Sequence, residues 1–185
     1  MVSRRRLLPA GVYVCSKRIA EYIGRTGYQD VKERLVPHLH AKGVRVHTHV
    51  VGSEALPRVR CAASYLTVNR WMIEALVRND ETESGYRKQG EARVHRTARV
   101  ASDAKLIGPV LIGPGCGIER DAVIVGPTSI GAGSQVGKLA TVSRSALWSS
   151  CRIGAGAVVD DCVLADNAVI DDGIMQRNAV CVATD

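Results

Sequence analysis

Aliphatic residues recur every six positions through the second half of this chain, and this period constrains its fold more than any other feature. They fall at Val94, Val100, Leu106, Ile112, Ile118, Ile124, Ile130, Val136 and Val142, then after a slip of one residue at Leu147, Ile153 and Val159, and after a second slip at Leu164 and Ile170. Helices have a period of 3.6 residues and strands a period of 2, so neither explains the spacing. Fourteen such repeats predict a parallel β-helix, in which short strands stack coil upon coil.

A second series of residues, most of them small or β-branched, follows each aliphatic residue by four positions. Its members are Ala98, Ala104, Val110, Cys116, Ala122, Thr128, Ser134, Ala140, Ala146, Cys151, Ala157, Val163, Ala168 and Ile174. Gly113, Gly131, Gly137 and Gly154 directly follow aliphatic residues, where a tight corner favours glycine. With three repeats to a triangular coil, residues 94–175 predict four to five coils whose aliphatic residues point inward.

The six cysteines predict free thiols rather than disulfides or metal ligands. They form no CxxC pair and have no histidine at metal-ligand spacing. The repeat places Cys116, Ser134 and Cys151 in one inward column, where coils about 4.8 Å apart separate the two cysteines too widely for a disulfide. Free thiols are typical of a reducing compartment, and no apolar stretch is long enough to span a membrane. We therefore expect a cytoplasmic protein without a membrane segment.

Residues 1–78 predict a partial α/β domain, and the polar, patternless segment 79–93 predicts a linker to the β-helix at 94–185. The expected elements are a strand at 11–14, a helix capped by Ser16, a helix capped by Asp30 with Glu33 three residues later, a strand at 44–51, and a closing helix with Tyr65, Asn69, Met72, Ile73 and Leu76 on one face. His47 and His49 share one face of the second strand. We interpret them as surface residues.

The net charge of +7 lies entirely in the first half of the chain, which could indicate a nucleic-acid partner. However, the basic residues there are scattered among acidic ones, and no aromatic residues alternate with them as a single-strand binding surface requires. We expect no nucleic-acid binding.

Several segments, taken in order, resemble the sugar nucleotidyltransferases, also called nucleotide-sugar pyrophosphorylases. They are Ala10-Gly11-Val12-Tyr13-Val14, the stretch from Asp30 to Pro37 (DVKERLVP), the stretch from Ser64 to Arg70 (SYLTVNR), the stretch from Gly126 to Gly131 (GPTSIG) and the stretch from Val142 to Trp148 (VSRSALW). In order and spacing they are similar to the last third of the catalytic domain, followed by the C-terminal left-handed β-helix, of members like mannose-1-phosphate guanylyltransferase. The resemblance covers nearly the whole chain and implies a Rossmann-like α/β segment before the helix.

The sequence departs from this family where the chemistry would take place. The family's Gly-rich loop (G-x-G-T-R-L) and a downstream Lys hold nucleotide phosphates, and no such loop occurs in these residues. Arg58 stands where the family carries an Asp that helps bind Mg²⁺. The resemblance therefore implies no catalytic residue, metal or cofactor in this chain. Gly11, Tyr13, Asp30 and Lys32 match family positions near the sugar and are the candidate substrate-binding residues, although a strand, a helix cap and a solvated face also account for them.

Three functions remain open. The first is a noncatalytic, regulatory or truncated relative of the nucleotide-sugar pyrophosphorylases, binding a sugar phosphate or nucleotide sugar. The second is a hexapeptide-repeat acyltransferase, which needs a catalytic histidine, but only His95 follows residue 93. The third is an oligomerisation module. For the first and third we expect a homo-oligomer, or a partner chain that completes the α/β half.

Overall fold

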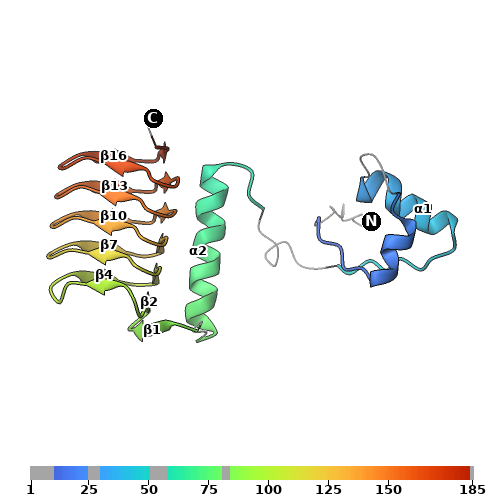
Figure 1. Ribbon diagram of the computed structural model, residues 1–185, viewed down its shortest axis with the longest axis horizontal. Coiled ribbons are helices and arrows are strands. Elements are labelled where there is room, and N and C mark those ends of the chain that lie inside the picture. Colours follow the sequence, from blue (N-terminus) through green and yellow to red (C-terminus); the bar gives the residue numbers. More distant parts are fainter. Residues whose placement is uncertain (1–10, 25–29, 51–57, 81–83, 184–185) are drawn as a thin grey trace, which may run out of the picture. The chain divides into compact units, whose positions relative to one another are not determined.

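The chain forms two compact units, residues 1–56 and 57–185. The computed structural model describes residues 11–24, 30–50, 58–80 and 84–183 (Figure 1). No helix within these ranges is long and apolar enough to cross a membrane.

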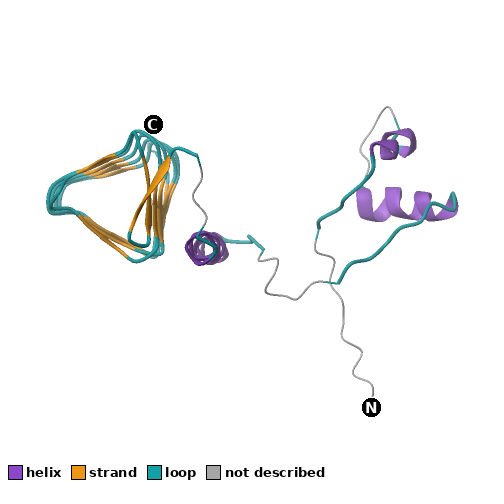
Figure 2. Cartoon of the chain, turned by 90° about the horizontal axis from the view of Figure 1, so that it is seen from below, coloured by secondary structure: helices purple, strands orange, loops and turns teal. Residues whose placement is uncertain are grey.

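Three sheets, whose strands are parallel except for β1, form the sides of a solenoid in the second unit, and Figure 2 shows its triangular cross-section. Sheet A contains β1 (Tyr86–Gln89), β2 (Ala92–His95), β5 (Val110–Ile112), β8 (Thr128–Ile130), β11 (Ala146–Leu147), β14 (Val163–Leu164) and β17 (Val180–Cys181) in that order. Sheet B contains β3 (Arg99–Val100), β6 (Gly117–Ile118), β9 (Gln135–Val136), β12 (Arg152–Ile153) and β15 (Val169–Ile170). Sheet C contains β4 (Lys105–Ile107), β7 (Val123–Val125), β10 (Thr141–Ser143), β13 (Val158–Asp160) and β16 (Met175–Arg177). The predicted parallel β-helix is confirmed, with about five coils, while its handedness stays a prediction.

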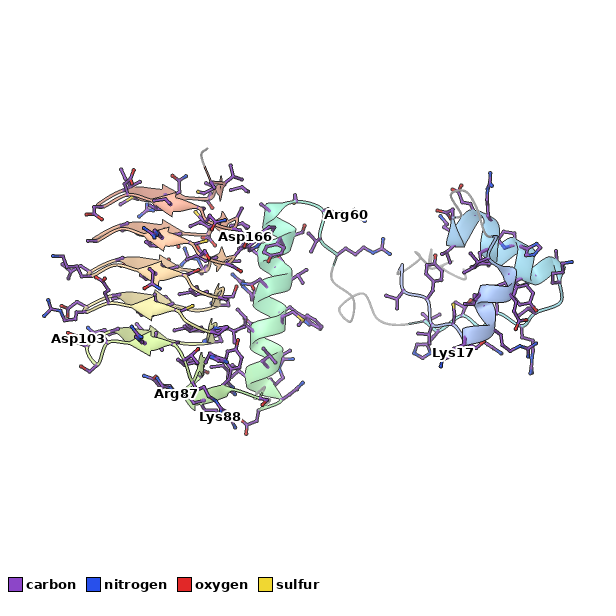
Figure 3. All side chains as sticks on the ribbon, in the orientation of Figure 1. Lys17, Arg60, Arg87, Lys88, Asp103 and Asp166 are labelled. Atoms are coloured by element: carbon purple, nitrogen blue, oxygen red, sulfur yellow. The ribbon has the colours of Figure 1, made fainter. Side chains whose placement is uncertain are left out.

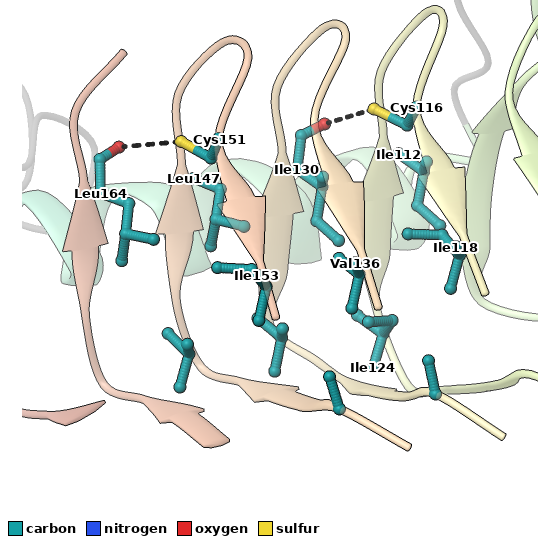
Figure 4. Packing of buried hydrophobic residues seen from close by; sticks show 14 of the residues in the cluster. Ile112, Cys116, Ile118, Ile124, Ile130, Val136, Leu147, Cys151, Ile153 and Leu164 are labelled. Atoms are coloured by element: carbon teal, nitrogen blue, oxygen red, sulfur yellow. Dashed lines mark hydrogen bonds between the residues drawn. The ribbon is translucent and has the colours of Figure 1, made fainter. Parts of the chain in front are cut away.

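The inward column of aliphatic residues is the core of the solenoid (Figure 4). Twelve of the fourteen predicted positions are buried, and Val100 and Leu106 in the first coil are partly buried against the same cluster. Cys116, Ser134 and Cys151 are buried as predicted, and both cysteines are free thiols. Their Sγ atoms donate to backbone carbonyls, at 3.1 Å to Gly131 and 3.2 Å to Ala165. These cysteines are core residues.

The two slips in the repeat correspond to a change at one corner of the solenoid, and they correct part of the second predicted series. Ala146 pairs with Ser129, and Val163 pairs with Ala146, so all three lie on the outer face of sheet A. The inward positions are taken instead by Ser145 and Cys162, each one residue earlier and fully buried. A shorter corner causes the shift, because a change of one residue moves a strand side chain to the other face. Ile174 also departs from the series, since it is exposed.

Buried hydroxyl groups replace backbone hydrogen bonds where the strands turn. The Ser145 hydroxyl donates to the Ser143 carbonyl at 2.7 Å and accepts from the Cys162 N–H at 3.0 Å. Ser134 acts in the same way between the Trp148 carbonyl and the Cys151 N–H, at 3.0 and 3.1 Å. No buried side-chain nitrogen or oxygen among the described residues lacks a partner, so the polar groups do not destabilise the interior.

Part of the segment predicted as a linker, 79–93, is structured. β1 lies within it and pairs antiparallel with β2, which also begins there, and this hairpin ends sheet A at the first coil. A covered edge leaves fewer unpaired backbone groups open to association.

Helix α2 (Ala62–Arg78) packs on the outer face of sheet A (Figures 1 and 2). The predicted closing helix is present. Ile73 on its predicted face is buried, whereas Met72, which was assigned to the same face, is exposed. The Ser129 hydroxyl lies 2.9 Å from the Asn69 side-chain oxygen, and the Trp148 Nε1–H donates to the Tyr65 hydroxyl at 3.0 Å. Although α2 was expected to belong with residues 1–78, it belongs to the same compact unit as the solenoid.

The first unit is helical in its described residues, and the predicted strands at 11–14 and 44–51 are not seen there. It contains η1 (Lys17–Tyr22, a 3-10 helix), η2 (Val31–Leu35, a π turn) and α1 (Val36–Ala41). Residues 11–14 and 44–50 belong to no helix or strand, Gly11 has φ 78, and position 51 lies outside the described residues. A strand needs a neighbour for its backbone groups, and residues 11–24 and 30–50 provide none.

The two predicted helix caps of this unit differ in outcome. The Asp30 carboxylate accepts from the Glu33 N–H at 2.6 Å, which confirms the cap at Asp30. Ser16 makes no capping hydrogen bond to η1. Leu35 and Leu39 form the small buried centre of this unit, and His47 and His49 are exposed as predicted. The α/β segment is therefore not established by the structure.

Candidate functional site

One corner of the solenoid, between sheets C and A, changes its chemistry from coil to coil. Its first two coils turn through Gly108-Pro109 and Gly126-Pro127. In the last three coils a single residue with positive φ makes the turn: Arg144 (φ 47), Asp161 (φ 51) and Asn178 (φ 50). Residues other than glycine adopt this conformation at a cost, and asparagine and aspartate tolerate it best. We call Arg144, Asp161 and Asn178 the polar corner.

Backbone hydrogen bonds hold the polar corner in place from coil to coil. The N–H groups of Arg144, Asp161 and Asn178 donate to carbonyls of the preceding coil, at 3.2 Å to Val125, 3.1 Å to Ser143 and 3.0 Å to Asp160. Side chains on such a regular backbone are fixed in height and direction, so the corner presents three polar groups at regular spacing.

Arg144 forms an ion-pair network with the next coil. Its Nε and Nη2 donate to Asp161 Oδ2 at 3.0 and 2.9 Å, and Nη2 also donates to Asp160 Oδ1 at 2.5 Å. The hydrogen bond with Asp161 is the main reason that the pKa of Arg144 is raised. Ser143 donates its hydroxyl to the same Asp160 oxygen at 2.5 Å. The charge of Arg144 is therefore neutralised within the protein.

Helix α2 faces the polar corner and closes a pocket beside it, which we call the corner pocket. Its volume is about 290 Å³. It is lined by Ala62, Ala63, Leu66, Thr67 and Arg70 of α2, by Pro127, by the polar corner, and by Ala179 and Val180. The polar groups thus come from three successive coils and from a helix at least 74 residues before the first of them. Small alanine side chains line both the helix side and the β17 side.

The corner pocket combines a cation with hydroxyl-binding groups. Arg70 is exposed, and it makes no ion pair within the described parts of the chain. Both contacts of Arg144 with Asp161 fall on Oδ2, which leaves Oδ1 able to accept from a ligand. The Asn178 amide can donate and accept, and the Thr67 hydroxyl oxygen can accept. These groups can bind, but they include no nucleophile paired with a base.

The candidate substrate-binding residues lie elsewhere, in the first unit. Gly11 has φ 78 and is exposed, Tyr13 is 47% exposed, and Lys32 is exposed on η2. Asp30 is half-buried, and its carboxylate caps η2. None of these residues lines the corner pocket. Their assignment to sugar binding stays a prediction.

His95, the candidate base for acyl transfer, braces the first corner of the solenoid. Its Nδ1 lies 2.8 Å from the Thr97 hydroxyl and accepts from the Thr97 N–H at 3.2 Å. The Thr97 hydroxyl oxygen accepts from the Gly115 N–H at 3.0 Å, and the His95 ring packs edge-on against Tyr86. These contacts give His95 a structural role. Within the described residues no cluster of three or more His, Cys, Asp or Glu side chains could hold a metal ion.

The two slips in the six-residue repeat mark the polar corner in the sequence, although they were not assigned to a corner in the sequence analysis. The repeat slips between Val142 and Leu147 and again between Val159 and Leu164, and Arg144 and Asp161 lie inside these two intervals. A lost residue at a corner marks a changed turn. The contribution of Thr67 and Arg70 has no such signal, because it depends on which sheet α2 covers.

Comparison with known proteins supports the relationship of the solenoid half. The sequence profile described as "GMPPB C-terminal domain" matches residues 88–185. No curated protein sequence matches the chain. Among solved structures, a variant of perosamine N-acetyltransferase from Caulobacter crescentus, in complex with CoA and GDP-perosamine, is 15% identical with a TM-score of 0.34. The match covers 82% of this chain and 72% of that chain. At this identity and TM-score, the similarity says nothing about the activity of this chain.

Proposed function

Because the chain belongs to the family of the GMPPB C-terminal domain, we propose that it is a nucleotide-sugar pyrophosphorylase-related subunit that forms no nucleotide sugar itself and whose solenoid serves assembly. The observation that carries this proposal is the extent of the family match. It begins at residue 88, inside β1, and runs through the solenoid to residue 185. The shared part is therefore the repeat structure, whose regular surfaces suit contacts between subunits.

The chemistry of residues 1–185 supports a noncatalytic role. Transfer of a nucleotidyl group to a sugar phosphate, with pyrophosphate as the leaving group, requires a site that neutralises the triphosphate and aligns its α-phosphorus. These residues contain no Gly-rich phosphate loop, and Arg58 stands where the resembled family has a metal-binding Asp. Among the residues that the structure describes, the corner pocket offers one arginine without an ion pair, which is too little charge for a triphosphate with its metal.

The last coil supports an assembly role. Within the described residues, no strand pairs with the outer edges of β15, β16 and β17. Ile174, Met175, Val180 and Val182 are exposed at the same end. Unpaired strand edges next to apolar side chains are a favourable surface for another polypeptide. A regulatory subunit of this kind would act on its partners through contacts at this surface.

A direct assay tests the noncatalytic part of the proposal. Purified chain would be incubated with Mg²⁺, a nucleoside triphosphate and a hexose 1-phosphate, and pyrophosphate release would be measured. We expect release at the rate of a control without protein, for each of the common nucleoside triphosphates. Release above that control, dependent on the amount of chain, would contradict the proposal.

A further inference from the structure

We propose that the corner pocket binds a small polyhydroxylated anion with the chemistry of a hexose phosphate. Its cationic group is Arg70, which lines the pocket and forms no ion pair within the described residues. Arg144, by contrast, is held by Asp160 and Asp161. A guanidinium that lines a pocket and has no ion pair among the described residues favours a single phosphate group, which arginine can bind through two parallel hydrogen bonds.

The rest of the polar lining suits hydroxyl groups better than a second phosphate. Asp161 Oδ1 can accept a hydrogen bond, and its negative charge disfavours another anion nearby. Asn178 can donate and accept, and the Thr67 oxygen can accept while its hydrogen is donated to the Ala63 carbonyl at 2.9 Å. Neighbouring hydroxyls of a sugar ring present donors and acceptors in the same alternation.

The size of the pocket suits a ligand with one sugar ring. Its volume of about 290 Å³ lies at the lower end of the range for small-molecule sites. Leu66 and the small side chains of Ala62, Ala63 and Ala179 provide an apolar surface for a ring face.

A ligand in this position would connect α2 to three coils at once. Arg70 and Thr67 belong to the helix, whereas Arg144, Asp161 and Asn178 belong to successive turns of the solenoid. Binding would therefore strengthen the packing of α2 on sheet A. That the anion is a sugar phosphate of the pyrophosphorylase reaction rests on the proposed function, whereas the preference for a polyhydroxylated anion rests on the pocket alone.

Isothermal titration calorimetry with the full chain tests the proposal. The probes are a hexose 1-phosphate, the same hexose without phosphate, and inorganic phosphate. The variants are Arg70→Gln, which removes the cation, Asn178→Gly, which keeps the positive φ but removes the amide, and Arg78→Gln, a control on the last turn of the same helix. Thermal unfolding of each variant checks that the fold is intact.

We expect the chain to bind the hexose 1-phosphate more tightly than either the hexose or inorganic phosphate. Arg70→Gln should weaken this binding at least tenfold, and Arg78→Gln should leave it unchanged. Asn178→Gly should weaken binding of the hexose 1-phosphate several-fold, with little effect on inorganic phosphate. No binding of the hexose 1-phosphate at millimolar concentration, or equal binding by Arg70→Gln and the unmodified chain, would overturn the proposal. Equal affinity for inorganic phosphate would overturn its sugar component. Neither result depends on the assembly or the pyrophosphate assay, so the two proposals fail separately.

Discussion

Ile130 and Ile107 show how the direction of a side chain decides its role in the solenoid. Ile130 points inward from β8 and is 1% exposed, whereas Ile107 points outward from β4 and is 50% exposed. Replacing Ile130 with Asp puts an unpaired carboxylate into a dry interior, so we expect a loss of at least about 3 kcal/mol in unfolding free energy. The matched change Ile107→Asp should alter it by roughly 0.5 kcal/mol. Denaturant unfolding of both variants measures the difference, and equal stability would show that the inward ladder is misassigned.

The cysteines differ in reactivity according to their surroundings. Cys61 is exposed at the start of α2, beside Arg60, which extends away from the helix (Figure 3). Hydrogen bonds from the backbone and hydroxyl of Ser64 lower the pKa of Cys61, while burial raises the pKa of Cys116 and Cys151. A lower pKa means more thiolate at a given pH.

We therefore expect iodoacetamide to alkylate Cys61 first, and to do so already at pH values below those needed for an ordinary exposed thiol. Cys15, which is also exposed, is the matched comparison. Peptide mass spectrometry over a pH series gives the rate at each cysteine. Cys116 and Cys151 should react only after unfolding. Faster alkylation of either buried thiol than of Cys61 in the folded chain would contradict this description of the core.

Single residues of the solenoid were largely predictable because a six-residue period fixes which side chains face inward. The residues that face outward against the prediction follow corners that are one residue shorter than the others. Ala146 and Val163 satisfy the spacing, but the one-residue turns at Arg144 and Asp161 shift them outward and bring Ser145 inward. The prediction counted four residues from each aliphatic residue, which assumes that every corner has the same length. Sequence spacing alone does not show whether the missing residue lies before or after the inward residue of the second series.

At the scale of elements, α2 illustrates what an amphipathic pattern can and cannot predict. The pattern predicted the helix and the burial of Ile73. However, α2 packs on sheet A, and the sequence of the helix does not identify that partner surface. Trp71 and Met72 remain exposed on α2. The corner pocket could not be predicted for the same reason, since its walls meet only after α2 docks on the solenoid.

Hydrogen exchange should separate the elements by the hydrogen bonds that hold them. Backbone amides of the solenoid strands are bonded from coil to coil, and those of α2 are bonded within a helix packed on sheet A. Residues 11–16 and 45–50 are exposed and belong to no helix or strand. We expect slow exchange in 62–78 and 92–177, and fast exchange in 11–16 and 45–50. Uniformly slow exchange across both units would mean that the first unit is a complete domain. Fast exchange in α2 beside a protected solenoid would contradict its docking.

At the scale of the whole molecule, the two units differ in how well each buries its apolar residues. The second unit has one continuous core along the solenoid. In the first unit Leu35 and Leu39 are buried, while Val12, Val14 and Val50 are exposed. The resemblance of this first unit to part of an α/β catalytic domain led us to expect paired strands, but a parallel sheet requires neighbours far apart in sequence. A partner chain that supplies such strands stays a prediction.

The central claim is that the solenoid serves assembly, and its exposed last coil is the proposed surface. Met175 is 58% exposed and Val182 is 64% exposed at that end, whereas Leu139 is 62% exposed at a lateral corner. Lysine at the first two positions would place charge against any partner of the edge strands and should prevent association. Lysine at position 139 is the matched control.

Sedimentation velocity of the purified full chain over a range of micromolar concentrations tests this claim most directly. The account predicts an oligomer for the unmodified chain and for Leu139→Lys, and a monomer for the double variant Met175→Lys with Val182→Lys. A monomer at every concentration for the unmodified chain, or an oligomer that the double variant leaves intact, would contradict it.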